Sequence, residues 1–272
     1  MRPALVARFG GAFLLSIFVV LPAGAQQTPP VKPAPSTTQP KPAPLKPKVP
    51  KQYRGFLSLS GGIQWAAGTL SDQFTYDVNV ETATTSVEYD STTAPLLDVG
   101  AGWRFWKTTG IAVGLSYSSV KSSAQTESEI PHPFFDDRPR VVSGEAENLH
   151  RIETDVHVQL FWLREHRKWR TRVLGGLTHF TVKQDVVTSI NVVETYPYDT
   201  AEFHSASRER ASGSGIGFNV GVDVAWMFTR QFGWGGAVRY TRGTTDLNVT
   251  GDRSVSTDAG GVQAVTGVRI AF

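Results

Sequence analysis

The stretch RIETDVHVQLFW, residues 151–162, changes between polar and apolar at nearly every position. One side of an extended chain with this sequence carries Ile152, Thr154, Val156, Val158, Leu160 and Trp162. The other side carries Arg151, Glu153, Asp155, His157 and Gln159. Because successive side chains of a β-strand point to opposite faces, this alternation predicts a strand with apolar surroundings on one face and polar surroundings on the other.

Similar alternation recurs through residues 53–272 and predicts eight strands. They cover about 53–66, 94–106, 110–124, 147–163, 169–185, 212–228, 232–249 and 258–272. The predicted connections at one end are short (107–109, 164–168 and 229–231), and those at the other end are long (67–93, 125–146 and 186–211) or moderate (250–257). Within the first long connection, the segment from Phe74 to Tyr89 also alternates, and we expect it to extend the barrel as a hairpin. Short turns at one end, long loops at the other and an even number of strands are typical of an outer-membrane β-barrel.

Alternation alone leaves open which face of each strand points outward. A soluble barrel of the lipocalin type buries its apolar face, whereas a membrane barrel turns that face to lipid. The aromatic residues favour lipid, because many of them lie beside the predicted short turns, and aromatic side chains gather at membrane interfaces. This predicted periplasmic girdle comprises Trp103, Phe105, Trp162, Trp226, Phe228, Trp234 and Phe272. We therefore predict an all-β fold, an eight-stranded antiparallel up-and-down transmembrane β-barrel with short periplasmic turns and long extracellular loops.

The last predicted strand alternates up to the final residue, through Val262, Ala264, Thr266, Val268, Ile270 and Phe272. The end Gly-Val-Arg-Ile-Ala-Phe looks like the signal that bacterial barrel-assembly machinery recognises, with Val268, Ile270 and Phe272 as its apolar positions. On this end and on its architecture, the region 53–272 resembles the small outer-membrane β-barrel superfamily, which includes the OmpA transmembrane domain, OmpX and the neisserial opacity proteins. Unlike full-length OmpA, the chain ends at the barrel, so we do not expect a role in anchoring the cell wall.

Turning the apolar face to lipid sends the charged face inward. The residues predicted to form an ion-pair network in the lumen are Arg54, Asp98, Arg104, Arg151, Glu153, Asp155, His157, Asp223, Arg239 and Arg269, with Arg170 and Arg172 as further candidates. The interior of an eight-stranded barrel is just wide enough for side chains to fill. Since an unpaired buried charge costs several kcal/mol, we expect these groups to pair and to plug the barrel. The alternative is that the network gates a narrow path.

The first 52 residues predict export. Arg2 and Arg8 precede an apolar stretch and the small residues Ala23-Gly24-Ala25, which predicts a signal peptide over 1–25 with cleavage after Ala25. Residues 26–52 contain nine prolines and five lysines, with no acidic residue, and predict a disordered periplasmic tether. The chain has no Cys, which excludes lipoprotein anchoring, disulfides and thiolate chemistry.

The charge of the predicted barrel excludes one class of partner. Outside the first 52 residues there are 20 Lys and Arg against 24 Asp and Glu, a net charge of about −4. The basic pI of about 9.2 therefore comes from the segments that precede the barrel. We expect no nucleic-acid binding, which requires a basic patch on a folded surface.

Three groups of residues invite a catalytic or metal-binding interpretation. Glu153, Asp155 and His157 share a strand face, but the neighbouring arginines disfavour a cation there. The segment 131–137 contains His132, Asp136 and Asp137, for which a mobile acidic loop is the simpler explanation. His204 and Ser205 have the ingredients of a lipid A-modifying enzyme, yet no acidic partner at membrane depth accompanies them. We expect no enzymatic activity, no metal site and no cofactor.

The long loops are then the best candidates for function, because a rigid barrel that presents polar loops suits contact at the cell surface. We predict a protein of the bacterial outer membrane that serves envelope structure, or binding and adhesion through its loops. A narrow channel and a lipid A-modifying enzyme are the alternatives. The expected partners are outer-membrane lipid and lipopolysaccharide, the barrel-assembly machinery and an extracellular ligand.

Overall fold

The computed structural model describes residues 53–66, 70–78, 80–90, 92–249 and 253–272. The predicted signal peptide and tether, 1–52, lie outside the described residues. Within the described ranges, no helix is long and apolar enough to cross a membrane. The strands are β1 (Gly55–Ala66), β2 (Leu70–Val78), β3 (Glu81–Tyr89), β4 (Thr93–Arg104), β5 (Thr109–Ile130), β6 (Arg140–His166), β7 (Trp169–Glu194), β8 (Ala201–Met227), β9 (Phe232–Val249) and β10 (Arg253–Ala271).

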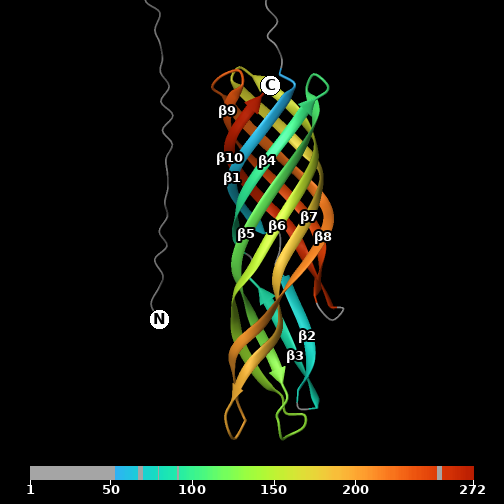
Figure 1. Ribbon diagram of the computed structural model, residues 1–272, viewed down its shortest axis with the longest axis vertical. Coiled ribbons are helices and arrows are strands. Elements are labelled where there is room, and N and C mark those ends of the chain that lie inside the picture. The colour runs from blue at the N-terminus through green and yellow to red at the C-terminus, as the bar shows by residue number, and fades with distance from the viewer. Residues whose placement is uncertain (1–52, 67–69, 79, 91, 250–252) are drawn as a thin grey trace, which may run out of the picture. The chain divides into compact units, whose positions relative to one another are not determined.

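Eight of these strands close into a ring in which every neighbouring pair is antiparallel (Figure 1). The order around the ring is β1, β4, β5, β6, β7, β8, β9 and β10, and β10 returns to pair with β1. Apart from the β2–β3 hairpin, which interrupts the sequence between β1 and β4, each strand lies beside the next one along the chain. The predicted eight-stranded up-and-down barrel is confirmed.

Two of the predicted long connections, 125–146 and 186–211, are largely strand, whereas the sequence predicted loops there. β5 and β6 continue as a hairpin up to the loop 131–139, and β7 and β8 continue up to the turn 195–200. The predicted hairpin between Phe74 and Tyr89 is confirmed as β2 and β3, and β3 pairs with the outer part of β5. Three hairpins thus extend the barrel on the side opposite the short turns (Figure 1). Cross-strand pairing satisfies the backbone groups that a loop would leave to water.

In the part of the barrel near the short turns, apolar side chains face outward and polar ones face inward. Leu97, Leu160 and Leu177 are each at least 60% exposed, whereas Asp155 and His157 are almost fully buried. We call the outward band of exposed Leu, Val, Ile and aromatic side chains the apolar belt. A soluble barrel would have the opposite arrangement, so this is the construction of a transmembrane β-barrel.

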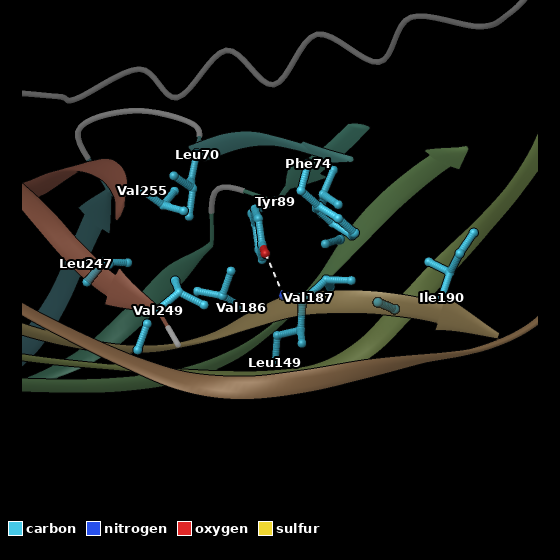
Figure 2. Packing of buried hydrophobic residues seen from close by; sticks show 14 of the residues in the cluster. Leu70, Phe74, Tyr89, Leu149, Val186, Val187, Ile190, Leu247, Val249 and Val255 are labelled. Carbon is cyan, nitrogen blue, oxygen red and sulfur yellow. Dashed lines mark hydrogen bonds between the residues drawn. The ribbon is translucent and has the colours of Figure 1, made fainter. Parts of the chain in front are cut away.

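In the hairpin extension the polarity is reversed (Figure 2). Its interior holds an apolar cluster that includes Leu70, Phe74, Tyr89, Leu149, Val186, Val187, Ile190, Leu247 and Val255. The outward positions of these hairpins are mainly Ser, Thr, Gln and charged residues. The same ring of strands therefore has its apolar face toward lipid at one end and toward its own core at the other, as burial from water requires.

One hydrogen bond compensates for a break in the strand pairing of this extension. The pairing of β6 with β7 ends at Arg151 and Gln184, which leaves the next part of β7 without β6 as a neighbour. The buried N–H of Val187 donates instead to the hydroxyl of Tyr89, at 2.9 Å (Figure 2). Burial is the main cause that raises the pKa of Tyr89 to about 12, so the hydroxyl stays protonated at physiological pH.

We expect Tyr89→Phe to lower the free energy of unfolding by about 1–3 kcal/mol, because it leaves the N–H of Val187 buried without a partner. The matched control is Tyr76→Phe, which removes a hydroxyl beside the same core that forms no hydrogen bond with any of the described residues. Urea unfolding of the refolded protein measures both. Equal losses for the two variants would contradict this role of Tyr89.

The apolar belt makes a second prediction. Val220 points outward at the middle of the belt. Ser214 points outward on the same strand, beyond the belt on the hairpin side. We expect Val220→Arg to cost about 2–4 kcal/mol and Ser214→Arg about 0–1 kcal/mol, because the cost of a cation on the lipid face depends on its depth. Unfolding from lipid vesicles measures the difference, and similar costs at both positions would contradict the belt.

Candidate functional site

The barrel interior holds a network of charged and polar side chains in successive layers. Nearest the short turns, the carboxylate of Glu165 lies 3.8 Å from Arg104 and 3.2 Å from Arg170. Arg104 also donates to the backbone carbonyl of Tyr53. Arg54 was predicted to belong to this network. It lies before β1 at the mouth of the lumen, with its side chain exposed, and it forms no ion pair among the described residues, so its predicted pairing is wrong.

In the next layer one carboxylate serves two guanidinium groups. Asp223 lies 3.0 Å from Arg172 and 2.8 Å from Arg269, and all three are buried. Arg269 also donates to the hydroxyl of Ser60, and the guanidinium of Arg172 lies 3.7 Å from the centre of the Phe56 ring. Each cation of this layer therefore has an anionic partner and a further contact, as buried charges require.

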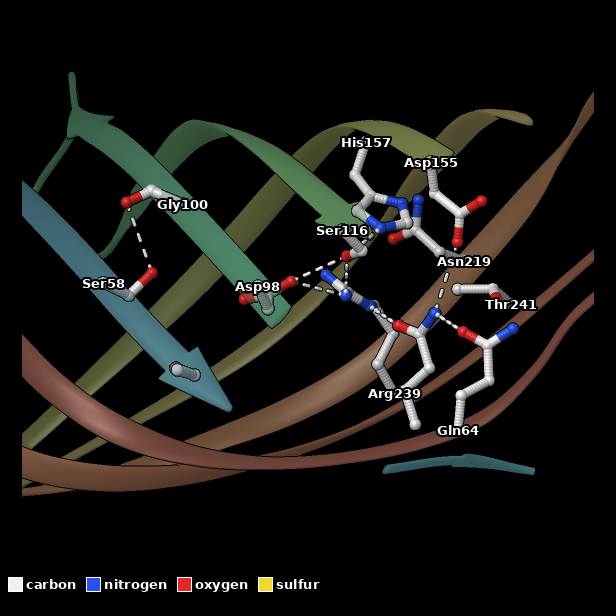
Figure 3. Close-up of polar contacts among 12 residues, drawn as sticks. Ser58, Gln64, Asp98, Gly100, Ser116, Asp155, His157, Asn219, Arg239 and Thr241 are labelled. Atoms are coloured by element: carbon white, nitrogen blue, oxygen red, sulfur yellow. Dashed lines mark hydrogen bonds and ion pairs between the residues drawn. The ribbon is translucent and has the colours of Figure 1, made fainter. Parts of the chain in front are cut away.

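The middle layer is centred on Asp98 and Arg239, whose charged atoms are 2.7 Å apart (Figure 3). The hydroxyl of Ser116 donates to Asp98 at 2.8 Å and accepts a hydrogen bond from Arg239 at 2.7 Å. His157 reaches Ser116 with one ring nitrogen (3.0 Å) and Thr178 with the other (2.9 Å). Both imidazole nitrogens are therefore occupied within the network.

Two glutamines connect this layer to the carboxylates of β6. Gln263 accepts from Arg239 and donates to Gln64 (2.8 Å) and to Asp155 (3.3 Å). Glu153 accepts hydrogen bonds from three donors, Gln64 at 3.0 Å, Arg151 at 3.1 Å and the backbone N–H of Gly260 at 2.7 Å. Gly260 has φ of +89°, a conformation that favours glycine.

The charged members of the network were predicted from strand alternation, whereas its neutral members were not. Gln64 and Gln263 link the ion pairs, and Ser60 and Ser116 accept from their arginines. A branch from His157 continues through neutral residues of the inward face, Thr178, Asn219 and Gln159. Their position on the same strand face as the charges was the available signal. Two cavities beside the network have volumes of only about 50 and 40 Å³, room for a few water molecules. The interior is filled with side chains.

The predicted girdle residues all lie near the short turns. Trp103, Phe105, Trp162, Trp226, Phe228, Trp234 and Phe272 are between 45% and 61% exposed. Trp106, which was not predicted to belong to the girdle, is exposed there too, because β4 ends at Arg104 and Trp106 lies in the turn, whereas the predicted strand 94–106 would have turned it inward. Phe272 also exchanges backbone hydrogen bonds with Gly55, so the end of the chain closes the ring of strands.

The residues that the sequence suggested for catalysis or metal binding lie in two different environments. Glu153, Asp155 and His157 belong to the network described above, and among the described residues no group of three His, Asp or Glu side chains is placed to hold a metal. His204 and Ser205 are adjacent residues of β8 at a β-bulge, where the register with β7 skips His204, and the hydroxyl of Ser205 accepts a hydrogen bond from the side chain of Asn191 at 3.1 Å.

A second candidate site lies at the ends of the hairpins. Arg140, at the start of β6, is buried and donates to the carbonyls of Pro131 (2.7 Å) and Tyr198 (3.0 Å). It also contacts the carboxylate of Glu194 at 2.5 Å. Arg140 thereby joins the loop of the β5–β6 hairpin to the turn of the β7–β8 hairpin, two segments that are distant in sequence.

Four aromatic residues gather on these joined segments, and we call Phe134, Phe135, Tyr196 and Tyr198 the tip cluster. The ring centres of Phe134 and Tyr198 are 5.5 Å apart, and those of Tyr196 and Tyr198 are 6.0 Å apart. His132 is buried beneath Phe135, with 4.8 Å between the rings. Phe134, Phe135 and Tyr196 are 71%, 55% and 82% exposed.

The third hairpin and an ion pair add to the support of the tip cluster. The N–H of Asp137 donates to the carboxylate of Glu81, at the start of β3 (3.0 Å). Arg138 lies 3.2 Å from Asp199 and 5.6 Å from the centre of the Phe135 ring. The exposed aromatic rings are therefore held on a base made from all three hairpins.

Comparison with known proteins finds similarity only among solved structures. No protein-family model matches the chain, and no curated protein matches it. The matches include the outer membrane protein OprG from Pseudomonas aeruginosa, with 11% identity and a TM-score of 0.40, over 81% of this chain and 97% of OprG. Neisserial surface protein A matches with 10% identity and a TM-score of 0.37, over 80% of this chain and 97% of that protein.

Ail, the attachment invasion locus protein of Yersinia pestis, matches with 11% identity and a TM-score of 0.34, over 80% of this chain and 99% of Ail. These are small outer-membrane barrels, the class that the sequence resembles. With identities this low and TM-scores below 0.5, it is the strand pairing of the chain itself that defines the fold.

The double pairing of Asp223 makes a prediction. We expect Asp223→Ala to destabilise the barrel by about 3–5 kcal/mol, because it leaves two buried guanidinium groups without their anion. The control Asp199→Ala breaks the exposed pair with Arg138 and should cost about 0–1 kcal/mol. Unfolding from lipid vesicles measures both, and an Asp223→Ala cost as small as that of the control would refute the plugged interior.

Proposed function

We propose that the protein is a non-enzymatic surface protein of the bacterial outer membrane that binds an extracellular ligand through the tip cluster. In this proposal the short turns face the periplasm and the three hairpins project from the cell. The observation that carries the proposal is the exposure of three aromatic rings on a base held by Arg140.

Exposed aromatic residues usually mark a contact surface when they are contiguous and rigidly supported. Aromatic side chains offer a large contact area at low cost in conformational entropy, which is why they are common in binding surfaces. Here the buried Arg140, the ring of His132 and the Arg138–Asp199 pair hold the rings in place. A solvated loop without a ligand has no need of this support, so the arrangement favours binding.

The filled interior argues against the alternative of a narrow channel. Ion pairs and amide side chains occupy the lumen in several layers, and the cavities beside them are small. Any conduction would require several buried pairs to separate at once, which costs several kcal/mol for each charge left unpaired.

Adherence of cells that display the protein tests the proposal. We expect the triple variant Phe134→Ser, Phe135→Ser, Tyr196→Ser to lose most of the adherence that the parent shows on plates coated with fibronectin, laminin or mucin. The matched control is Val141→Ser, which removes an exposed apolar side chain of β6 outside the tip cluster. Adherence of the triple variant equal to that of the parent would refute the proposal, provided that both reach the surface in equal amounts.

A further inference from the structure

We propose that the outward face of β5 to β8, on the hairpin side of the apolar belt, binds the phosphate groups of lipopolysaccharide in the outer leaflet. The residues of this basic face are Lys121, His150, His179 and Lys183, with Arg210 and Arg208 further from the belt on β8. The proposal rests on the outer-membrane orientation proposed above, but it concerns a different surface from the tip cluster.

The basic face begins where the apolar belt ends. The outermost exposed apolar residues of the belt on these strands are Tyr117, Val156, Leu177 and Ile216. His179 pairs in register with both Val156 and Ile216, which places it at the edge of the belt. Lys183 is the second outward residue after His179 along β7. Strand rise and tilt together place it roughly 10 Å further from the belt, toward the hairpin tips.

That height suits a lipid headgroup. The headgroup layer adds about 5–8 Å to each side of the hydrocarbon core. A lysine side chain can extend along an apolar surface and return its ammonium group toward that layer. Lys183 can therefore reach phosphates from above the belt.

The cations of the basic face come from four neighbouring strands. Lys121 of β5 lies opposite His150 of β6, and Lys183 of β7 lies opposite Ser212 of β8. Arg208, also on β8, donates to the backbone carbonyls of Glu147 and Asn148 on β6. Since adjacent strands are about 4.8 Å apart, these groups form one continuous surface.

Two lysines of the basic face are available to bind an anionic ligand. Two acidic residues lie beside the arginines of β8. Arg208 donates to the backbone carbonyl of the exposed Glu147, and the carboxylate of Asp185 is held by Arg210 at 3.0 Å and by the N–H of His150 at 3.1 Å. Lys121 and Lys183 are exposed, and neither forms an ion pair within the described part of the chain. On the other side of the barrel, by contrast, Arg242 faces Asp258 at 3.5 Å.

Phosphate matches these donors better than other headgroup chemistry does. Its oxygens accept several hydrogen bonds and carry the negative charge that ammonium and guanidinium groups bind. The exposed hydroxyls of Ser212 and Ser214, outward on the same surface, supply further donors. The phosphates of lipopolysaccharide lie at the height of the basic face in an outer membrane.

Titration of the folded barrel with bis-phosphorylated lipid A, in a zwitterionic detergent, tests this site by native mass spectrometry. We expect the double variant Lys121→Gln, Lys183→Gln to bind lipid A about 30-fold more weakly than the parent, from the contribution of a lysine at an anionic lipid surface. The matched control is Lys107→Gln, Lys168→Gln, which removes two exposed lysines at the short-turn end and should bind as the parent does.

Three outcomes would overturn the proposal. The first is equal affinity in the two double variants, and the second is equal affinity of the parent for lipid A from which both phosphates have been removed. The third is binding of inorganic phosphate as tight as that of lipid A, which would indicate a site for soluble anions. A heat-dependent gel shift confirms that each variant is folded. The tip-cluster triple variant should bind lipid A normally, so failure of this proposal is distinguishable from failure of the tip-cluster proposal.

Discussion

The rest of the structure depends on one constraint, that a backbone crossing the apolar core of a membrane must satisfy every N–H and C=O group within the protein. β10 meets this constraint by pairing with β1 from Phe56–Ala271 to Ala66–Gly261, which removes the last free edge at belt level. Once the ring is closed with eight strands, its diameter is set, and the space inside is just wide enough for the ring's own side chains. Both the filled interior and the outward apolar belt follow from this closure.

The narrow interior explains why its charges are paired so completely. Asp223 serves Arg172 and Arg269, Asp98 serves Arg239, and amide side chains connect one pair to the next. Beyond the belt, the same strands leave lipid and enter water. There the favourable direction for apolar side chains reverses, and the apolar cluster around Tyr89 and Val187 fills the inside of the hairpins instead.

A closed, plugged barrel is a rigid support, and the candidate functional surfaces lie where it meets other molecules. The tip cluster is the most distant of these surfaces from the short turns and depends on Arg140, which joins two hairpins through three contacts. The basic face lies closer to the short turns, at the edge of the belt, on the outer surface of the barrel wall. The two surfaces share no residue, so the two proposed contacts, one with the leaflet around the barrel and one with a ligand beyond it, are compatible with each other.

The sequence by itself determined the number of barrel strands, which face of each strand is apolar, and the positions of the short turns, because side-chain alternation and local turns are properties of neighbouring residues. Only the tertiary structure decided which charges pair, since partners such as Arg269 and Ser60 are far apart in the chain and meet only through strand register. The same holds for the hairpins that replace the predicted loops, for the tip cluster and for Arg54, whose alternation suited the lumen but whose place before β1 leaves it exposed. Alternation specifies a face, whereas the identity of a partner depends on how distant strands are aligned when the ring closes.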